Sequence, residues 1–271
     1  MTIPKVELKP CFLTPKKLQP EYPLLVYLPG MDGTGQLLRT QTVGLEAGFD
    51  VRCLAIPRND LTSWEDLTNN VLDLIHAELE RNSQRLVYLC GESFGGCLAQ
   101  KVAIQAPYLF KRIILINPAS SFKLRSWYVW VSPLMNYVPE WMFDVGAIGL
   151  LPFLASLSRL SESDRTELLE TVRSVPSETI RWRVSLLREF DIDTAKLSEL
   201  TQPVLIVASS DDRLLPSLEE ARRLINILPN SKIEILPNSG HACLLEADIN
   251  LYEILKSNDF LDIREEIKIR N

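Results

Sequence analysis

The sequence contains few of the patterns that mark zinc, nucleic-acid-binding or membrane-spanning proteins. It has two histidines and five cysteines with no C-x-x-C pair, so we expect reduced thiols and neither a Cys/His zinc site nor a disulfide framework. The net charge is −6 without a basic cluster, which argues against nucleic acid as a partner. No run reaches the ~18 consecutive apolar residues of a membrane span.

The first twenty residues also lack the features of a targeting segment. They contain no apolar core of the kind found in a secretory signal. They include Glu7 and several lysines, whereas an organellar transit peptide is rich in Ser and Arg and poor in acidic residues. Together with the unpaired cysteines, this predicts a cytoplasmic protein.

Short apolar runs alternate with helical patterns, which is typical of a mostly parallel sheet with helices on both faces. With 271 residues, we expect one α/β domain over residues 1–271. The β-branched runs predict buried strands at residues 22–28, 49–56, 85–90, 112–116, 203–208 and 232–236. Apolar spacing and caps predict helices at residues 63–81, 94–106, 217–228 and 243–256.

Residues 122–200 interrupt this alternation, and we interpret them as a helical cap inserted within the domain. Residues 126–138 and 145–157 carry no charge, and the segment contains Trp127, Trp130, Trp141, Phe143 and Phe153. One interpretation is that these side chains simply pack on the core. The other is that they form a tunnel for an acyl chain or contact a membrane surface, which would make the protein peripheral there. The density of aromatic residues favours a lipid-like substrate.

The segment Gly91-Glu92-Ser93-Phe94-Gly95 lies between a predicted strand and a predicted helix. In that position the G-x-S-x-G pattern predicts a sharp turn that holds a serine in a strained conformation above the sheet. The alternative is a tight turn with an incidental serine. The context favours Ser93 as a nucleophile.

A serine hydroxyl needs a base within hydrogen-bond reach, and the chain offers His76 and His241. His76 falls inside the predicted helix 63–81, where a packed or solvated helix face explains it. His241 follows the last predicted strand, and loops beyond the carboxyl ends of strands are where an open α/β sheet places its site. We therefore predict His241 as the base.

The acid should come between the serine and the histidine in the chain. The strand 203–208 runs into Ser209-Ser210-Asp211-Asp212-Arg213, so two aspartates compete for this role. Neighbouring side chains diverge, and only one of the two can point at the histidine. We predict Asp212, four residues before the proline that starts the next helix, and treat Asp211 as a loop or capping residue.

An oxyanion needs backbone N–H donors. We predict one donor at Phe94, the residue after the nucleophile, and a second at Met31 in the loop after the first strand. Asp32-Gly33 in that loop is expected to serve turn formation. The glycines at 30, 33 and 35 do not have the spacing of a dinucleotide fingerprint. No metal or organic cofactor is needed for this chemistry.

These residues together resemble the α/β-hydrolase superfamily over about residues 22–255. More narrowly, Leu28-Pro29-Gly30-Met31-Asp32-Gly33-Thr34-Gly35 is similar to the first motif of the plastid esterase/lipase/thioesterase family, which includes plant phytyl ester synthases and cyanobacterial relatives. The segments Gly91 to Ala99 and Ile116-Asn117-Pro118-Ala119 also resemble that family. The resemblance assigns the nucleophile, acid and base to Ser93, Asp212 and His241.

The resemblance implies a fatty acyl ester or thioester as substrate, with transfer to phytol, diacylglycerol or water. The plant proteins resemble a hydrolase half followed by an acyltransferase half, and they carry transit peptides. This chain shows neither, so we expect hydrolysis and a cyanobacterial-type protein. The alternatives are acyl transfer to an alcohol, cleavage of a carbon–carbon bond in a diketone, and a non-catalytic binding module on the same fold.

Overall fold

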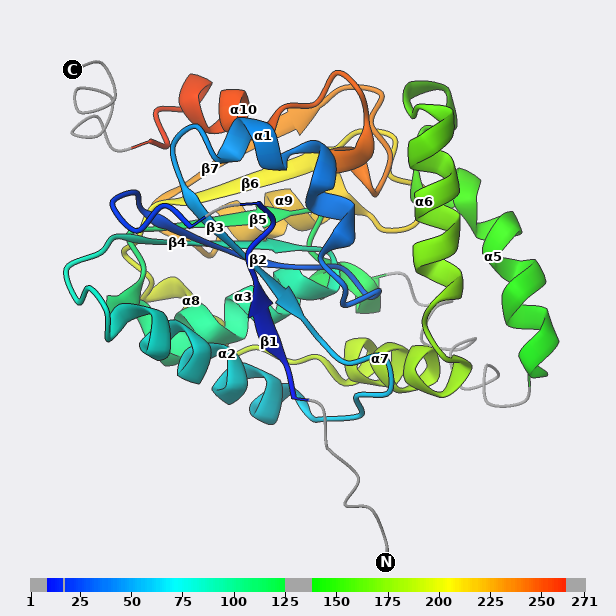
Figure 1. The fold of residues 1–271 in the computed structure, drawn as a ribbon, viewed down its shortest axis with the longest axis horizontal. Coiled ribbons are helices and arrows are strands. Elements are labelled where there is room, and N and C mark those ends of the chain that lie inside the picture. The colour runs from blue at the N-terminus through cyan, green and yellow to red at the C-terminus, as the bar shows by residue number, and fades with distance from the viewer. Residues whose placement is uncertain (1–8, 17, 125–137, 262–271) are drawn as a thin grey trace, which may run out of the picture.

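The computed structural model describes residues 9–16, 18–124 and 138–261. Within them, seven strands form one sheet in the order β1-β3-β2-β4-β5-β6-β7, and every neighbouring pair is parallel except β1 and β3. Figure 1 shows the sheet crossing the centre of the molecule. The strands are β1 (Cys11–Leu13), β2 (Leu24–Leu28), β3 (Asp50–Ala55), β4 (Val87–Glu92), β5 (Arg112–Ile116), β6 (Val204–Ser209) and β7 (Ser231–Leu236).

All six predicted strands are present, and none of their ends differs from the prediction by more than two residues. β2, β4 and β6 are buried along their whole length, as expected for strands covered on both faces. The prediction of full burial is wrong for β7, because it lies at an edge of the sheet and Ile235 is 51% exposed. The short antiparallel strand β1 was not predicted, since three residues carry little pattern.

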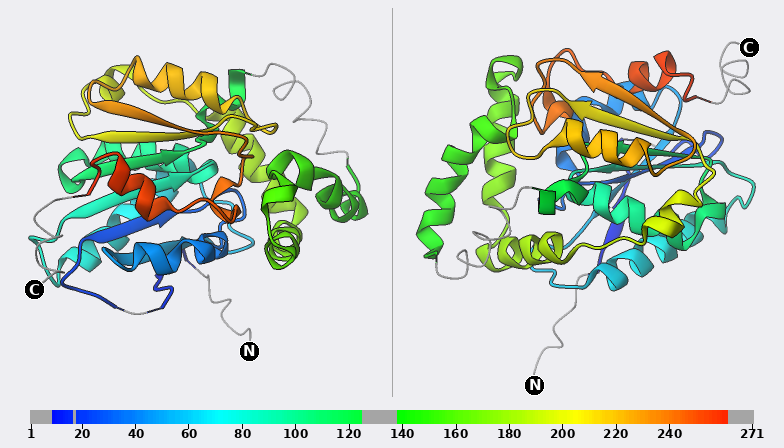
Figure 2. Two further views of the ribbon diagram at one scale, coloured as in Figure 1. Left: turned by 90° about the horizontal axis from the view of Figure 1, so that it is seen from above. Right: turned by 180° about the vertical axis from the view of Figure 1, so that it is seen from behind.

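Helices cover both faces of the sheet, as the views in Figure 2 show. α2 (Trp64–Leu79), α3 (Phe94–Gln105) and α9 (Ser217–Ile225) contribute Val71, Leu98 and Leu224 to one apolar core. α1 (Thr42–Leu45) and α10 (Leu251–Ser257) contribute Leu45 and Leu255 to a second core on the other face. Ser63 caps α2, because its hydroxyl accepts a hydrogen bond from the Asp66 amide at 3.1 Å.

The predicted closing helix over residues 243–256 is wrong. The structure has a 3-10 turn at Cys243–Leu245 and a separate helix α10. Asn250 caps α10 by accepting from the Glu253 amide, and the Leu251 amide donates to the side chain of Gln41. These side-chain acceptors satisfy a new helix start, so the apolar pattern continues across a break in the helix.

Part of the segment predicted as a cap forms four helices, and the first three of them lie near the carboxyl ends of the strands. They are α5 (Glu140–Leu154), α6 (Glu162–Arg173), α7 (Ser177–Glu189) and α8 (Thr194–Ser198). Figure 1 shows α5 and α6 side by side beyond the sheet, with α7 below them. Trp127 and Trp130 lie outside the described residues. Among the helices that are described, none is long and apolar enough to span a membrane.

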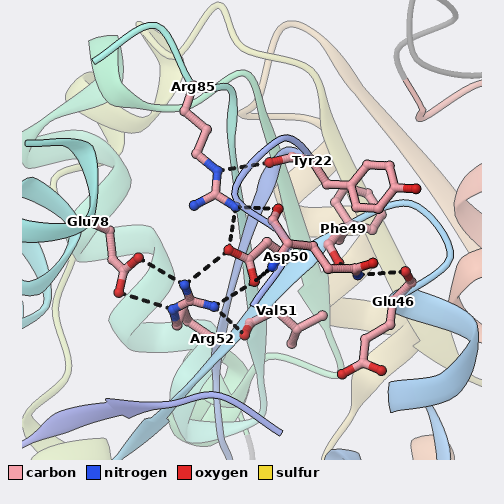
Figure 3. A network of polar contacts seen from close by, with 9 residues as sticks. Tyr22, Glu46, Phe49, Asp50, Val51, Arg52, Glu78 and Arg85 are labelled. Atoms are coloured by element: carbon pink, nitrogen blue, oxygen red, sulfur yellow. Dashed lines mark hydrogen bonds and ion pairs between the residues drawn. The ribbon is translucent and has the colours of Figure 1, made fainter. Parts of the chain in front are cut away.

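A buried ion-pair network closes the opposite end of the sheet, at the amino ends of the central strands. Asp50 at the start of β3 is fully buried and accepts from Arg52 at 2.7 Å and from Arg85 at 2.5 Å. Arg52 also pairs with Glu78 of α2 at 3.0 Å, as Figure 3 shows. Burial opposes ionisation of Asp50, but the two guanidinium groups outweigh it and lower the pKa of Asp50. The network joins strands and helix far from the carboxyl ends of the strands.

Candidate active site

Ser93 occupies the tight turn between β4 and α3 in a strained backbone conformation. Its φ and ψ angles are 54° and −114°, a region of backbone conformation that residues other than glycine rarely adopt. The Ser93 amide donates to the Ile116 carbonyl at 2.9 Å, and the Ser93 carbonyl accepts from the Ala119 amide at 2.9 Å. The end of β5 therefore fixes this turn on both sides, as expected for a serine held above a sheet.

The glycines of the turn allow the chain to pass very close to itself. A Cβ atom at Gly95 would lie 2.0 Å from the Leu28 carbonyl oxygen, and one at Gly91 would lie 2.3 Å from the Gly95 carbonyl oxygen. Both contacts are with backbone, which cannot move aside as a flexible side chain could. The G-x-S-x-G spacing is thus explained by close approach of α3 to β2 and β4.

The structure brings Ser93 and His241 into hydrogen-bond contact. His241 Nε2 lies 2.8 Å from Ser93 Oγ, and His241 Nδ1 lies 2.7 Å from Asp212 Oδ2. The imidazole is 4% exposed. The other histidine, His76, is exposed on α2, as the sequence predicts. A buried imidazole between a hydroxyl and a carboxylate can take a proton from one while the other fixes its tautomer.

Asp212 and Asp211 differ clearly in their hydrogen bonds and in their exposure. Asp212 Oδ1 accepts from the amides of Leu214 and Leu215 at 2.9 and 2.8 Å, and Oδ2 accepts from the Ser217 hydroxyl as well as contacting the imidazole. The Asp211 side chain is exposed, and its carboxylate accepts from the Ser210 hydroxyl at 3.3 Å. Asp212 is therefore the aspartate that faces His241.

Burial and pairing act against each other at both of these groups. Burial disfavours the charged form of Asp212, but the imidazole and the Ser217 hydroxyl outweigh it and lower the pKa of Asp212. Burial likewise opposes the imidazolium, yet Asp212 raises the pKa of His241. The pair thus favours a carboxylate beside an imidazole that readily accepts a proton. Among the described residues, no group of three or more His, Cys, Asp and Glu side chains gathers as a metal site.

The two predicted oxyanion donors lie beside the Ser93 turn. A Cβ atom at Gly30 would be 3.8 Å from Ser93 Cβ, so the loop after β2 runs next to the serine. The Gly30 carbonyl accepts from the Gly33 amide at 3.0 Å, and because a trans peptide holds C=O and N–H on opposite sides, the Met31 N–H points the other way. Phe94 begins α3, where an amide has no acceptor within the helix. Asp32 accepts from the Thr34 amide at 2.8 Å, as predicted for turn formation.

Two buried polar residues that the sequence did not identify hold the His241 loop. Asn117, with φ of 41° at the end of β5, donates to the His241 carbonyl at 2.8 Å and to the Ser209 hydroxyl at 2.9 Å. Glu246 accepts from the Gly240 amide at 2.7 Å and from the Ser239 hydroxyl at 2.8 Å. The available signal for Asn117 was its place directly after a strand, at the same edge of the sheet as Ser93.

Glu92, the last residue of β4, adds a second buried carboxyl group next to Ser93 in the chain. Its side chain is buried and accepts a short hydrogen bond from the Tyr27 hydroxyl. Burial raises the pKa of Glu92 to about 7, against the opposing effects of Tyr27 and His241. Glu92 is therefore a carboxyl group that changes charge near neutral pH within the site.

Comparison with known proteins matches this chain to one protein family and to two plant relatives. A family model described as serine aminopeptidase, S33 matches residues 56–248. Phytyl ester synthase 1 of Arabidopsis thaliana is 34% identical over 86% of this chain and 36% of its own length. Phytyl ester synthase 2 of the same plant is 29% identical over 88% of this chain and 38% of its own length. The chain thus spans less than two fifths of the length of these relatives.

A solved structure supports the fold independently. MenH from S. aureus superposes with a TM-score of 0.73 at 18% identity, over 93% of this chain and 99% of that chain. At this identity the likeness shows the fold alone. It is the predicted α/β-hydrolase fold, a mostly parallel sheet with helices on both faces.

Proposed function

Because this chain belongs to the serine aminopeptidase S33 family of α/β hydrolases, we propose that it cleaves acyl esters or thioesters through a covalent intermediate on Ser93. The observation that carries the proposal is the unbroken line of contacts from Ser93 Oγ through the His241 ring to Asp212, at 2.8 and 2.7 Å. Such a line is the arrangement that activates a serine hydroxyl at neutral pH.

In the first half of the reaction, His241 Nε2 removes the Ser93 proton while Oγ attacks the acyl carbonyl carbon. The C=O π electrons move onto the oxygen, and the amides of Met31 and Phe94 donate hydrogen bonds to this oxyanion. Asp212 stabilises the imidazolium. When the oxyanion collapses, the bond to the leaving group breaks, and His241 delivers the proton to the departing alcohol or thiol.

In the second half, water takes the place of the leaving group. His241 removes a proton from the water, and the hydroxide oxygen bonds to the acyl carbon. A second oxyanion forms and accepts hydrogen bonds from the same two amides. Collapse breaks the bond to Ser93 Oγ, which regains its proton from the imidazolium. The products are a carboxylic acid and the alcohol or thiol, with the enzyme unchanged.

The apolar character of the cap supports a fatty acyl substrate. α5 carries no charge from Val145 to its end at Leu154, and Met142, Ile148 and Phe153 on this helix are 44%, 53% and 50% exposed. The last residue of α5 touches the His241 segment, because the Ala242 amide donates to the Leu154 carbonyl at 2.6 Å. An apolar helix beside the base favours a substrate with a long apolar chain.

Acyl transfer to an alcohol is the second candidate. It is favoured by the likeness to the two plant phytyl ester synthases, whose names describe formation of an ester with phytol. In chemical terms the change is small, since phytol or diacylglycerol would enter in place of water and lose its proton to His241.

Turnover of p-nitrophenyl esters from two to sixteen carbons, with the matching coenzyme A thioesters, tests the proposal. We expect kcat/KM to rise with chain length and to fall by at least roughly a thousandfold in Ser93→Ala. Equal rates at all lengths would contradict a fatty acyl substrate. Adding phytol and measuring phytyl ester against free acid decides the acceptor. Amino-acid p-nitroanilides in the same panel test a peptide substrate.

We also propose that the exposed apolar side chains of α5 contact a lipid surface while the substrate is drawn from it. Ile148→Ser combined with Phe153→Ser should reduce co-sedimentation with phosphatidylcholine vesicles, and leave kcat on a soluble short-chain ester unchanged. The pair Ile225→Ser and Ile235→Ser, on exposed positions of α9 and β7, is the matched control. Equal sedimentation of all three proteins would contradict the proposal.

A further inference from the structure

Helix α7 carries Arg183, whose side chain reaches the loop that contains the predicted oxyanion donor Met31. Arg183 is 2% exposed. Its Nη1 donates to the Met31 carbonyl at 2.6 Å, and its Nη2 donates to the Pro57 carbonyl at 3.3 Å. The guanidinium thus joins the loop after β2 to the loop after β3.

This buried cation is held by carbonyl groups and not by a carboxylate. Within the part of the chain that the structure describes, Arg183 makes no ion pair, although Asp32 and Asp60 lie near enough to favour its charge. Burial lowers the pKa of Arg183, but a guanidinium keeps its proton in proteins. A buried charge without an ion-pair partner costs stability, so its presence on the Met31 carbonyl points to a role beyond packing.

The loop is shaped to receive the guanidinium. Gly33 has φ of 71°, and a Cβ atom there would lie 2.8 Å from Arg183 Nη1. Its amide holds the Gly30 carbonyl at 3.0 Å, and its carbonyl accepts from the Ile56 amide at 2.7 Å. The peptide before Met31 is therefore fixed by Gly33, and the peptide after Met31 is fixed by Arg183.

The helix that carries Arg183 is itself anchored to the core. Trp182 Nε1 donates to the Thr62 carbonyl at 2.9 Å, and Trp64 Nε1 donates to the Leu186 carbonyl at 2.9 Å. These two indole bonds run in opposite directions between α7 and the start of α2. α7 is thus a fixed support from which Arg183 reaches the loop.

We propose that Arg183 is a positioning residue that sets the direction of the Met31 N–H toward the oxyanion. The inference rests on the proposed acyl chemistry at Ser93. Arg183 holds the Met31 carbonyl, which belongs to the peptide that follows Met31. The Met31 N–H belongs to the peptide that precedes it, and with the carbonyl fixed this N–H cannot turn away when the oxyanion forms. The positive charge of Arg183, held on the carbonyl of the residue that supplies the donor, also favours negative charge on the substrate oxygen.

Arg183→Met, which keeps the length of the side chain and removes its donors, tests this on a long-chain p-nitrophenyl ester. We expect kcat per titrated active site to fall roughly tenfold to a hundredfold, with KM within about twofold. Affinity for an alkyl trifluoromethyl ketone, which forms an oxyanion on Ser93, should fall by the same factor. A residue that only supports the fold would lower the titrated fraction of active protein and leave these per-site values unchanged.

Arg188→Met is the matched control, because Arg188 lies on the same helix and pairs with exposed Glu189. Its kcat should equal that of the unaltered protein. If Arg183→Met does not fold, Arg183→Lys gives the same readouts, with a loss of at least roughly threefold expected because a single ammonium cannot bridge both carbonyls. Unchanged per-site kcat and ketone affinity in the folded variant would overturn the inference. An unaltered protein that cleaves no ester would instead contradict the proposed function.

Discussion

The side-chain amide of Asn117 donates a hydrogen bond to the backbone carbonyl of His241 at 2.8 Å. The same amide group donates to the Ser209 hydroxyl, and its oxygen accepts from the Ser209 backbone at 2.8 Å. One buried residue at the end of β5 thus connects the loop of the predicted base to the strand that leads to Asp212. Asn117 therefore helps to set the relative position of the base and the acid, together with Glu246 and the direct contact between His241 and Asp212.

Asn117→Ala should therefore impair the reaction more than the fold. We expect kcat to fall roughly tenfold to a hundredfold, since small displacements of a reacting group cost about that much. Asn230→Ala is the matched control, because Asn230 donates to the Thr201 carbonyl far from the site. Steady-state kinetics on active-site-titrated protein make the comparison. Equal kcat for Asn117→Ala and Asn230→Ala would exclude a positioning role.

The two neighbouring aspartates should behave very differently. Asp212→Asn should lower kcat by roughly ten-thousandfold, because the amide favours the wrong imidazole tautomer and leaves the imidazolium without a counter-charge. Asp211→Asn should keep kcat within about twofold, since that side chain is exposed and does not contact His241. Kinetics on the two variants side by side provide the measurement. A large loss in Asp211→Asn would refute the assignment of the acid.

Glu92 should make the stability of the protein depend on pH. Its pKa is raised from 4.5 to about 7 in the fold, so its protonated form stabilises the folded state below pH 4.5 and this contribution is lost as the pH rises to about 7. A shift of this size corresponds to a loss on the order of 3 kcal/mol. In Glu92→Gln that loss should be absent. Urea unfolding of both proteins from pH 4.5 to 8 measures it, and parallel curves would contradict the prediction.

Two glycine-to-alanine changes should have opposite effects on stability. Gly95→Ala places a methyl group 2.0 Å from the Leu28 carbonyl oxygen, so the free energy of unfolding should fall by at least about 2 kcal/mol. Gly149→Ala lies in α5, where the new Cβ would meet nothing within 4 Å beyond its chain neighbours and the adjacent backbone of its own helix, and should raise it by about 0.5–1 kcal/mol. Urea unfolding measures both. An unchanged free energy of unfolding in Gly95→Ala would contradict the close approach of Gly95 to the Leu28 carbonyl oxygen.

The fold could be predicted from local pattern wherever that pattern was strong. Six strands and the turn at Ser93 follow from short apolar runs, most of which end at or close to a Pro or Gly, and these features depend on adjacent residues. The break at residues 246–250 could not be predicted, because the acceptor for the Leu251 amide is Gln41, more than two hundred residues away in the chain. The exposure of β7 depends on its place in the sheet order, which the strand sequence does not encode.

The candidate site likewise contains residues that could be predicted from the sequence and residues that could not. Ser93, His241 and Asp212 could be placed by their order in the chain and by their positions after strands. Asn117 and Arg183 could not, because each acts through a backbone carbonyl that any residue could supply. Arg183 in particular resembles the other arginines of α7 in sequence, and only the packing of α7 against residues 57–64 shows that it is buried.

The most direct test of the central claim is to treat the protein with a long-chain fluorophosphonate and measure its intact mass. We expect a single adduct on the unaltered protein, mapped by peptide sequencing to Ser93, and no adduct on Ser93→Ala. Strongly slowed labelling of His241→Ala, with its far-UV circular dichroism unchanged, would accompany it. No adduct on the unaltered protein, or an adduct that persists in Ser93→Ala, would contradict the account.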